Sequence, residues 1–396
     1  MSQITTHKLK GISINEKLIY FAFFSVLLHY VVTGVMMIAL GLFALINKES
    51  RKEIFAKKSH MLVVVFCIVT IGSALYYKNY LGILCTLAFY FLAIILYWAR
   101  STLTEKVFED SLSLCCVAAI PLSAAVAVEK YLNAGQKSYR CQLWFFNANY
   151  MTAIFAALAL FCVYKIIERS DKAWIYYISA IASLIAMYLS GSMFAFIELF
   201  VGVCMLLILR KKYILLAAFF FVVFLGLVIL YFNPEIFPRI LTASRQTDKR
   251  IRIWNEAMVI IKEHPIFGQG FLSYYHSAKQ NASLYQTTHA HNFALEPLIS
   301  FGIAGTVILL VLLWFYFKKV IICKEELNNE RITTLILSLC CGVVIHSTTD
   351  MTLMWIQTGL LYVLVLSAIG IDEKKLKINQ GEVPESEYHD LSFWEE

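Results

Sequence analysis

The chain has 396 residues, of which 60% are hydrophobic and only 15% are charged, and its mean hydropathy is +0.69. Soluble domains carry about 25% charged residues, so this composition excludes an ordinary soluble protein. The formal net charge of +7 resides mostly in loops between apolar runs, and it therefore bears on membrane topology before nucleic-acid binding.

The apolar runs are long enough to span a membrane as helices. The first extends from residue 18 to 46, which is too long for one comfortable span, so we expect a hairpin of two short helices that turns near 29–34. Further runs follow at 61–77, 80–98, 111–128, 148–167, 173–189, 193–209, 213–232, 293–317, 332–348 and 351–370. The sequence thus predicts an all-α polytopic membrane protein with about twelve transmembrane helices.

Basic residues are concentrated in alternate loops, which orients the chain. Four of these loops are basic and are expected to be cytoplasmic, namely 47–60, 100–106, 165–172 and 210–212. The chain then divides into an N-terminal transmembrane bundle of about nine helices (1–232), a long external loop (233–292), C-terminal transmembrane helices (293–371) and an acidic cytoplasmic tail (372–396). We expect the tail to be disordered.

The external loop is the longest polar segment, and its lysines and arginines outnumber its acidic residues. Loops of this length escape the charge rule, so a solvated surface is one explanation. A phosphate site is the other, because arginine presents paired donors that fit phosphate oxygens. The ten cysteines offer neither a disulfide framework nor metal-ligand spacing, and most of them lie in apolar runs.

An amphipathic helix is predicted over Arg250–Glu263, resting on the membrane or on the helical bundle. Its apolar residues recur at spacings of three and four, at Ile251, Trp254, Met258 and Ile261. Pro265 ends this helix, and the glycines at 268 and 270 permit a tight turn.

Two histidines, His289 and His291, precede the next apolar run. An imidazole can act as a base near neutral pH, although a pair of interfacial histidines is the plainer interpretation. The pair could supply two metal ligands, but this loop has no cysteine and no clustered carboxylates, so we expect no metal. The ionisable residues Glu198, His346 and Asp350 lie in or near apolar runs, where such residues face a cavity more often than lipid.

These residues resemble the O-antigen ligase and O-antigen polymerase superfamily of bacterial inner-membrane glycosyltransferases. The ligase pattern is His-Asn, nine residues, Gly, two residues, Gly, and it is matched by His291, Asn292, Gly302 and Gly305. The upstream pattern is matched by Arg250, Trp254, His264, Pro265, Gly268 and Gly270. Asp350, followed by Met-Thr-Leu-Met-Trp, also resembles the ligases, and the resemblance covers roughly residues 245–310.

One family feature is missing from the chain. The family often has Ser-Arg or Thr-Arg at the outer end of a middle span, where this sequence reads Ser-Gly-Ser-Met over 190–193. The diphosphate-binding role of that arginine is therefore expected to fall to another cation: Arg250, Arg252, Lys137 or Arg140.

The resemblance implies an O-antigen ligase that transfers a glycan from undecaprenyl diphosphate to lipid A-core by a metal-independent, inverting mechanism without a cofactor. The enzyme would lie in the bacterial inner membrane, with 233–292 as its periplasmic catalytic loop. Arg250, or Arg252 as second choice, would balance charge on the departing diphosphate. Neutral His291 would deprotonate the acceptor, and Asn292 would fix the orientation of His291. Lys249, His289 and Asp350 complete the expected substrate-binding residues.

Two alternatives remain open. A polymerase of the same superfamily would join one repeat unit to another on the lipid carrier, and the complete His-Asn-to-Gly-Gly match favours the ligase over it. A polytopic transporter or flippase would be a different class of protein. That class is expected to show internal repeats and ionisable residues near the bilayer midplane, and we see no repeat of fixed period.

Overall fold

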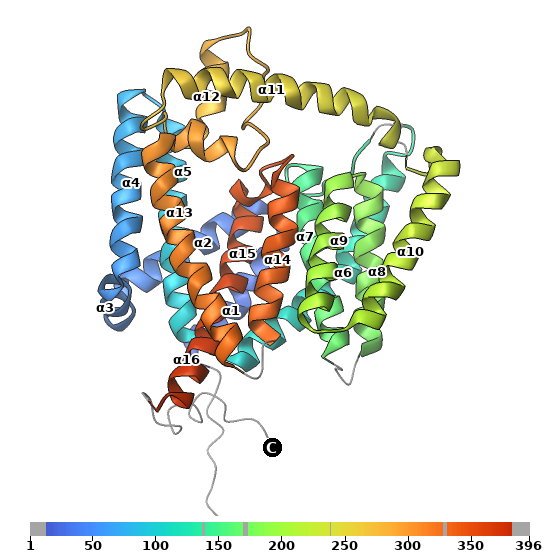
Figure 1. Cartoon of the computed structure of the whole chain (residues 1–396), viewed down its shortest axis with the longest axis horizontal. Helices are drawn as coiled ribbons and strands as arrows, with labels where there is room; N and C mark the ends of the chain where they lie inside the picture. The colour runs from blue at the N-terminus through green and yellow to red at the C-terminus, as the bar shows by residue number, and fades with distance from the viewer. Residues whose placement is uncertain (1–12, 137–138, 169–172, 238, 328–330, 382–396) are drawn as a thin grey trace, which may run out of the picture.

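The computed structural model describes residues 13–136, 139–168, 173–237, 239–327 and 331–381, which fold into helices and loops without a strand. Figure 1 shows an upright bundle of helices with a capping layer across one end. The α-helices are α1 (Ile14–Ser25), α2 (Tyr30–Ile46), α3 (Lys48–Ala56), α4 (Lys58–Tyr76), α5 (Tyr80–Thr102), α6 (Glu105–Leu132), α7 (Ala148–Ile167), α8 (Ala173–Ser190), α9 (Met193–Leu209), α10 (Tyr213–Phe232), α11 (Ala243–Glu263), α12 (Ser273–Gln280), α13 (Leu295–Glu326), α14 (Arg331–Ser347), α15 (Ile356–Ser367) and α16 (Ile369–Asn379). Short 3-10 turns lie at Pro234–Ile236, Ile240–Thr242 and Thr352–Met354.

Within the described residues, eight helical segments are long and apolar enough to cross a membrane, and the bent pair α2 and α3 would make a ninth. The chain is thus an all-α polytopic membrane protein, as its sequence predicts. The predicted total of about twelve also counts α1, α9 and α14, which are only 12, 17 and 17 residues long. The first apolar run is divided into α1 and α2, with the break at 26–29.

Helix α7 lies at the centre of the bundle. It packs against α6, α8, α9, α14 and α15, and 83% of the residues in its most apolar stretch of 18 are buried. The alanines of this helix explain its position, because small side chains let neighbouring helices approach closely. By contrast α10 has no buried residue and stands at the edge of the bundle (Figure 1). The first turn of the central helix therefore offers a rigid base for a site.

Charged residues join several predicted cytoplasmic loops at one end of the bundle. Glu168 of the 165–172 loop pairs with Arg210 at 2.7 Å and with Arg331 at 3.8 Å. Arg331 also pairs with Glu105 at 2.8 Å, which brings in the 100–106 loop. The segment 239–292 covers the opposite end, with α11 crossing above the bundle (Figure 1). This grouping is the one that the distribution of basic residues predicts.

The first part of the expected acidic tail is helical. Residues 372–379 belong to α16, whose Asp372 and Leu376 are buried. The helix is held because Glu373 pairs with Arg100 and the ammonium group of Lys374 donates to the carbonyl of Ser101 at 2.8 Å. Residues 382–396 of the expected tail lie outside the described residues.

Helix α11 confirms the predicted amphipathic helix but buries a different face. Ile253, Ala257 and Ile260 are buried, whereas Ile251 and Met258 of the predicted stripe are 46% and 44% exposed. The buried face packs on residues of α12 and of the start of α13, so the loop has a small core of its own. The sequence does not distinguish the buried face from the exposed one, because both faces of α11 carry apolar side chains.

The loop segment that contains Gly268 and Gly270 packs against the start of α13 at Gly302, with backbone in contact with backbone. Gly268 and Gly302 have φ of +61° and +60°, and Gly302 interrupts the helical geometry of α13. The N–H of Gly270 donates to the carbonyl of Ser300 at 2.8 Å, and that of Ile303 donates to Pro265 at 2.9 Å. A Cβ at Gly268 would lie 2.4 Å from the Ser300 oxygen, and one at Gly302 would lie 2.3 Å from the carbonyl carbon of Ile266. Only glycine fits these positions, and they fix the loop to the start of α13.

Candidate functional site

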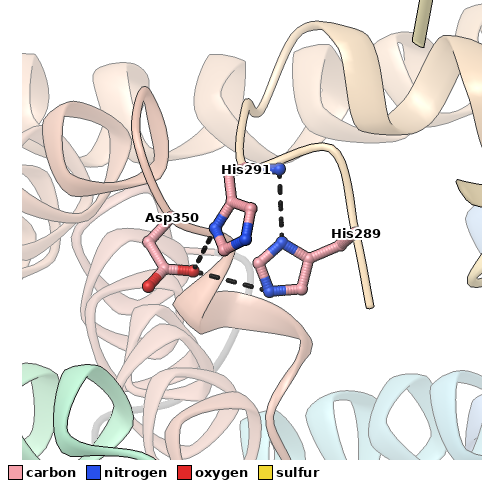
Figure 2. A group of neighbouring side chains, drawn as sticks. All are labelled: His289, His291 and Asp350. Carbon is pink, nitrogen blue, oxygen red and sulfur yellow. Dashed lines mark hydrogen bonds and ion pairs between the residues drawn. The ribbon is translucent and has the colours of Figure 1, made fainter. Parts of the chain in front are cut away.

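Two loops that are distant in sequence meet at a cluster of His289, His291 and Asp350 (Figure 2). The histidines precede α13, and the aspartate follows α14. Oδ1 of Asp350 lies 3.1 Å from Nδ1 of His291 and 3.4 Å from Nε2 of His289. The two loops are also joined by the N–H of Phe293, which donates to the carbonyl of Ser347 at 2.8 Å.

Hydrogen bonding assigns the tautomers of the two imidazoles. The backbone N–H of His291 donates to Nδ1 of His289 at 3.2 Å, which leaves the His289 proton on Nε2, facing Asp350. Since the Asp350 carboxylate accepts at Nδ1 of His291, the lone pair of His291 lies on Nε2. The hydroxyl of Thr287 contacts this nitrogen at 3.0 Å. His291 thus presents an unprotonated ring nitrogen, held by a carboxylate on its other side.

The pKa values of His289 and Asp350 support this arrangement. Burial, followed by the neighbouring His291, lowers the pKa of His289 to about 3, although Asp350 opposes the shift. Burial also disfavours ionisation of Asp350. The hydrogen bond from His291, then the electrostatic effects of His291 and His289, outweigh burial and keep the pKa of Asp350 below its ordinary value. At neutral pH the cluster therefore holds a neutral His289 and an ionised Asp350.

Asn292 has a different role from the one expected. Its Oδ1 accepts from the N–H groups of Ala294 at 2.9 Å and Leu295 at 3.2 Å, which caps the start of α13. Orientation of the His291 ring comes instead from Asp350 and Thr287. The His291 backbone has a φ of +51°, a strained value for a non-glycine residue that the surrounding hydrogen bonds maintain.

A pocket lined by three arginines adjoins this cluster. Oδ2 of Asp350 accepts from the amide of Asn149, on the first turn of α7, and Oδ1 of Asn149 accepts from Arg140 at 2.6 Å. Arg239 and Arg250 line the same cavity of about 130 Å³. Arg250 donates from Nε to the carbonyl of Thr349 at 3.0 Å. Asp350 is therefore shared between the histidine cluster and the arginine pocket.

The pocket is built for anionic ligands. Burial, followed by the neighbouring Arg239 and Arg250, lowers the pKa of Arg140 to about 10, against the opposing effect of Asp350. Burial also lowers the pKa of Arg250 and of Arg239. Partly buried guanidinium groups that repel one another gain from a ligand of high negative charge. The N-terminus of α9 lines the pocket as well, and its N-cap Ser192 makes no side-chain cap.

Arg140 lies against the segment 190–193, in which the Ser-Arg of the family pattern is missing. Its Nε donates to the carbonyl of Ser190 at 2.9 Å, directly before the Gly-Ser-Met segment that opens α9. From the sequence, Arg140 is only one of several candidate cations, and neither Arg239 nor Asn149 has a predicted role. Arg140 is 50 residues from Ser190, and the packing of α7 on α8 brings the two together.

Some expected residues lie elsewhere. Arg252 does not line the pocket: its side chain is 56% exposed, pairs with Glu256 at 2.7 Å and donates to the carbonyl of Ser283 at 2.8 Å. It points away because it is two residues from Arg250, hence on another face of α11. Lys249 is partly exposed and does not line the pocket either. Lys137 lies outside the described residues.

The histidine cluster also has the composition of a metal site. One ligand atom from each of His289, His291 and Asp350 lies within 4.8 Å of the others. The external loop supplies only the two histidines of this set, and the carboxylate arrives from the loop after α14. The adjacent guanidinium groups oppose a divalent cation at this position.

Residues 178–310 match the family model for O-antigen ligase. The matched segment extends from α8 to α13 and includes Arg239, Arg250, His289 and His291. No curated protein matches the chain. The match covers about a third of the chain and supports the resemblance to the O-antigen ligase and O-antigen polymerase superfamily that the motifs indicate.

Proposed function

We propose that the protein is an O-antigen ligase, which transfers a glycan from undecaprenyl diphosphate to lipid A-core. The observation that carries this proposal is the direct junction, through Asp350 and Asn149, of a three-arginine pocket with a carboxylate-held histidine. Glycan transfer from a diphosphate needs both parts: positive charge for the leaving group and a base for the acceptor hydroxyl.

The geometry supports the following reaction. The donor diphosphate occupies the pocket lined by Arg140, Arg239 and Arg250. The acceptor oxygen attacks the anomeric carbon as the bond from that carbon to the diphosphate oxygen breaks, and the bonding electron pair leaves with the diphosphate. Nε2 of His291 takes the hydroxyl proton, and Asp350 stabilises the imidazolium that forms. A single displacement of this kind inverts the anomeric centre.

No metal ion takes part in this scheme. The charge that a divalent cation would supply at a diphosphate is supplied by the three guanidinium groups and the N-terminus of α9. The chain carries the base as an imidazole, so a metal-bound hydroxide has no role in the reaction.

The proposed reaction is tested by the lipopolysaccharide of a strain that lacks the gene. A ligase predicts loss of all O-antigen bands on lipid A-core, with lipid-linked glycan retained. A polymerase of the same superfamily would leave a band of core plus one repeat unit. Complementation with the wild-type gene restores the ladder, and unchanged lipopolysaccharide in the deletion strain contradicts both functions.

The site is proposed to face the periplasm of a bacterial inner membrane. Ser283→Cys, on the exposed part of the loop, should react with a membrane-impermeant thiol reagent in intact spheroplasts. Glu49→Cys, in the basic α3 at the other end of the bundle, is the matched control and should react only after lysis. The reverse labelling pattern would overturn this orientation.

A further inference from the structure

A second imidazole–carboxylate pair lies deeper in the arginine pocket. His346, near the end of α14, lines the pocket although its side chain is only 1% exposed. Its Nδ1 lies 2.5 Å from Oε2 of Glu198 on α9. Oε1 of Glu198 accepts from the hydroxyl of Tyr362 at 3.4 Å. The mechanism above uses none of these three residues.

The close packing of α9 on α14 forms this pair. Gly342, one turn before His346, lies so near α9 that a Cβ there would be 2.6 Å from the carbonyl oxygen of Glu198. Ionisable residues within membrane-spanning helices are costly and are typically retained for function. The pair of His346 and Glu198 is therefore a candidate functional part of the pocket.

One atom of the pair has no partner. Among the described residues, Nε2 of His346 is buried and makes no hydrogen bond. Buried polar atoms are almost always hydrogen-bonded, because leaving one unpaired forfeits its hydration without compensation. The side chain of His346 lines the pocket of arginines, so a ligand of that pocket is the natural candidate for the missing partner.

We propose that His346 is a further phosphate ligand, donating from Nε2 to a diphosphate oxygen while Glu198 accepts from Nδ1. The inference rests on the proposed function and extends it to the membrane-facing floor of the site. Both ring nitrogens then carry a proton, and the imidazolium is compensated by Glu198 on one side and by the phosphate on the other. His346 would bind the leaving group, and His291 would handle the acceptor proton.

Binding of inorganic diphosphate to the purified full-length protein in detergent, measured by calorimetry, tests the assignment. His346→Phe removes the donor and should weaken binding about 10- to 100-fold, the usual effect of losing a hydrogen bond to a charged group. His346→Gln retains an N–H donor and should recover part of the affinity. With the lipid-linked donor, His346→Phe should raise KM for the donor while KM for the acceptor stays at the wild-type value.

His60→Phe is the matched control, because His60 is also a buried histidine in a membrane-spanning helix but contacts Tyr90, away from the pocket. It should bind diphosphate as the wild type does. Glu198→Gln provides a second variant if His346→Phe does not fold; it keeps the shape, removes the compensating charge and should also weaken binding. Wild-type affinity in a folded His346→Phe or Glu198→Gln protein would overturn the inference.

The two proposals fail in different ways. A wild-type protein that binds diphosphate more tightly than His346→Phe, yet transfers no glycan, supports the phosphate ligand and rejects the proposed reaction. Glycan transfer that depends on Arg250, combined with unchanged diphosphate binding in folded His346→Phe, rejects the phosphate ligand alone.

Discussion

Replacing His291 with asparagine is expected to lower the rate of glycan transfer by about 10²- to 10⁴-fold, the usual contribution of a general base. The amide of asparagine cannot take a proton from the acceptor hydroxyl. Asparagine nevertheless tolerates the positive φ of +51° at this position better than alanine does, so folding should be preserved. The measurement is transfer in membranes, normalised to the amount of folded protein.

Two comparisons make the His291 prediction specific. His289→Ala should lose less activity, because we expect His289 to support the cluster and not to act as the base. It is buried, and its pKa of about 3 keeps it neutral. Treatment with EDTA should leave wild-type transfer intact. Abundant, fully active His291→Asn protein would remove the base from the mechanism, and EDTA-sensitive transfer restored by zinc would show that the cluster holds a metal.

Replacing Arg250 with alanine is expected to reduce transfer by at least about 10²-fold, since removal of one preorganised electrostatic donor commonly costs 10² to 10³ in rate. Arg250 is the pocket arginine that also donates to Thr349, next to Asp350. Arg250→Lys should retain part of the activity because it keeps the charge and loses the planar pair of donors. Steady-state kinetics with the lipid-linked donor measure both effects.

Arg252→Ala is the matched control for Arg250→Ala. It removes the same side chain two residues further along α11, where the guanidinium is exposed and pairs with Glu256. An exposed ion pair of this kind contributes little to stability, and Arg252 does not line the pocket. Near-normal transfer is therefore expected. Activity lost in Arg252→Ala and retained in Arg250→Ala would contradict the position of the donor pocket.

The membrane fold could be predicted because its physical cause is local. Each span needs a continuous apolar run, and the connecting basic loops reveal which ends lie together. Helix α11 was harder, because apolar side chains cover more than one face. Ile253, Ala257 and Ile260 are as regularly spaced as Ile251 and Met258, and only the packing of α12 and α13 selects between the two sets.

Some residues of the candidate site could be named from the sequence, but their arrangement could not. His291 and Asp350 were both singled out, yet they are 59 positions apart, and their contact depends on how α14 returns beside α13. Arg140 and Arg239 carry no motif, so their charge could be counted but not placed. The pairing of Glu198 with His346 across 148 positions has the same origin, since it is set by packing between helices.

The interlocked glycines change what the His-Asn-to-Gly-Gly spacing signifies. Gly302 accommodates the backbone at Ile266 and so serves the junction between loop and span, whereas a Cβ at Gly305 would meet the Cβ of Phe301 at 2.5 Å within α13. The chain from His291 to Gly302 links this junction to the imidazole that contacts Asp350. The spacing from His291 to Gly302 is therefore a property of the scaffold, and we expect it in any chain that folds such a loop onto a kinked span in this way.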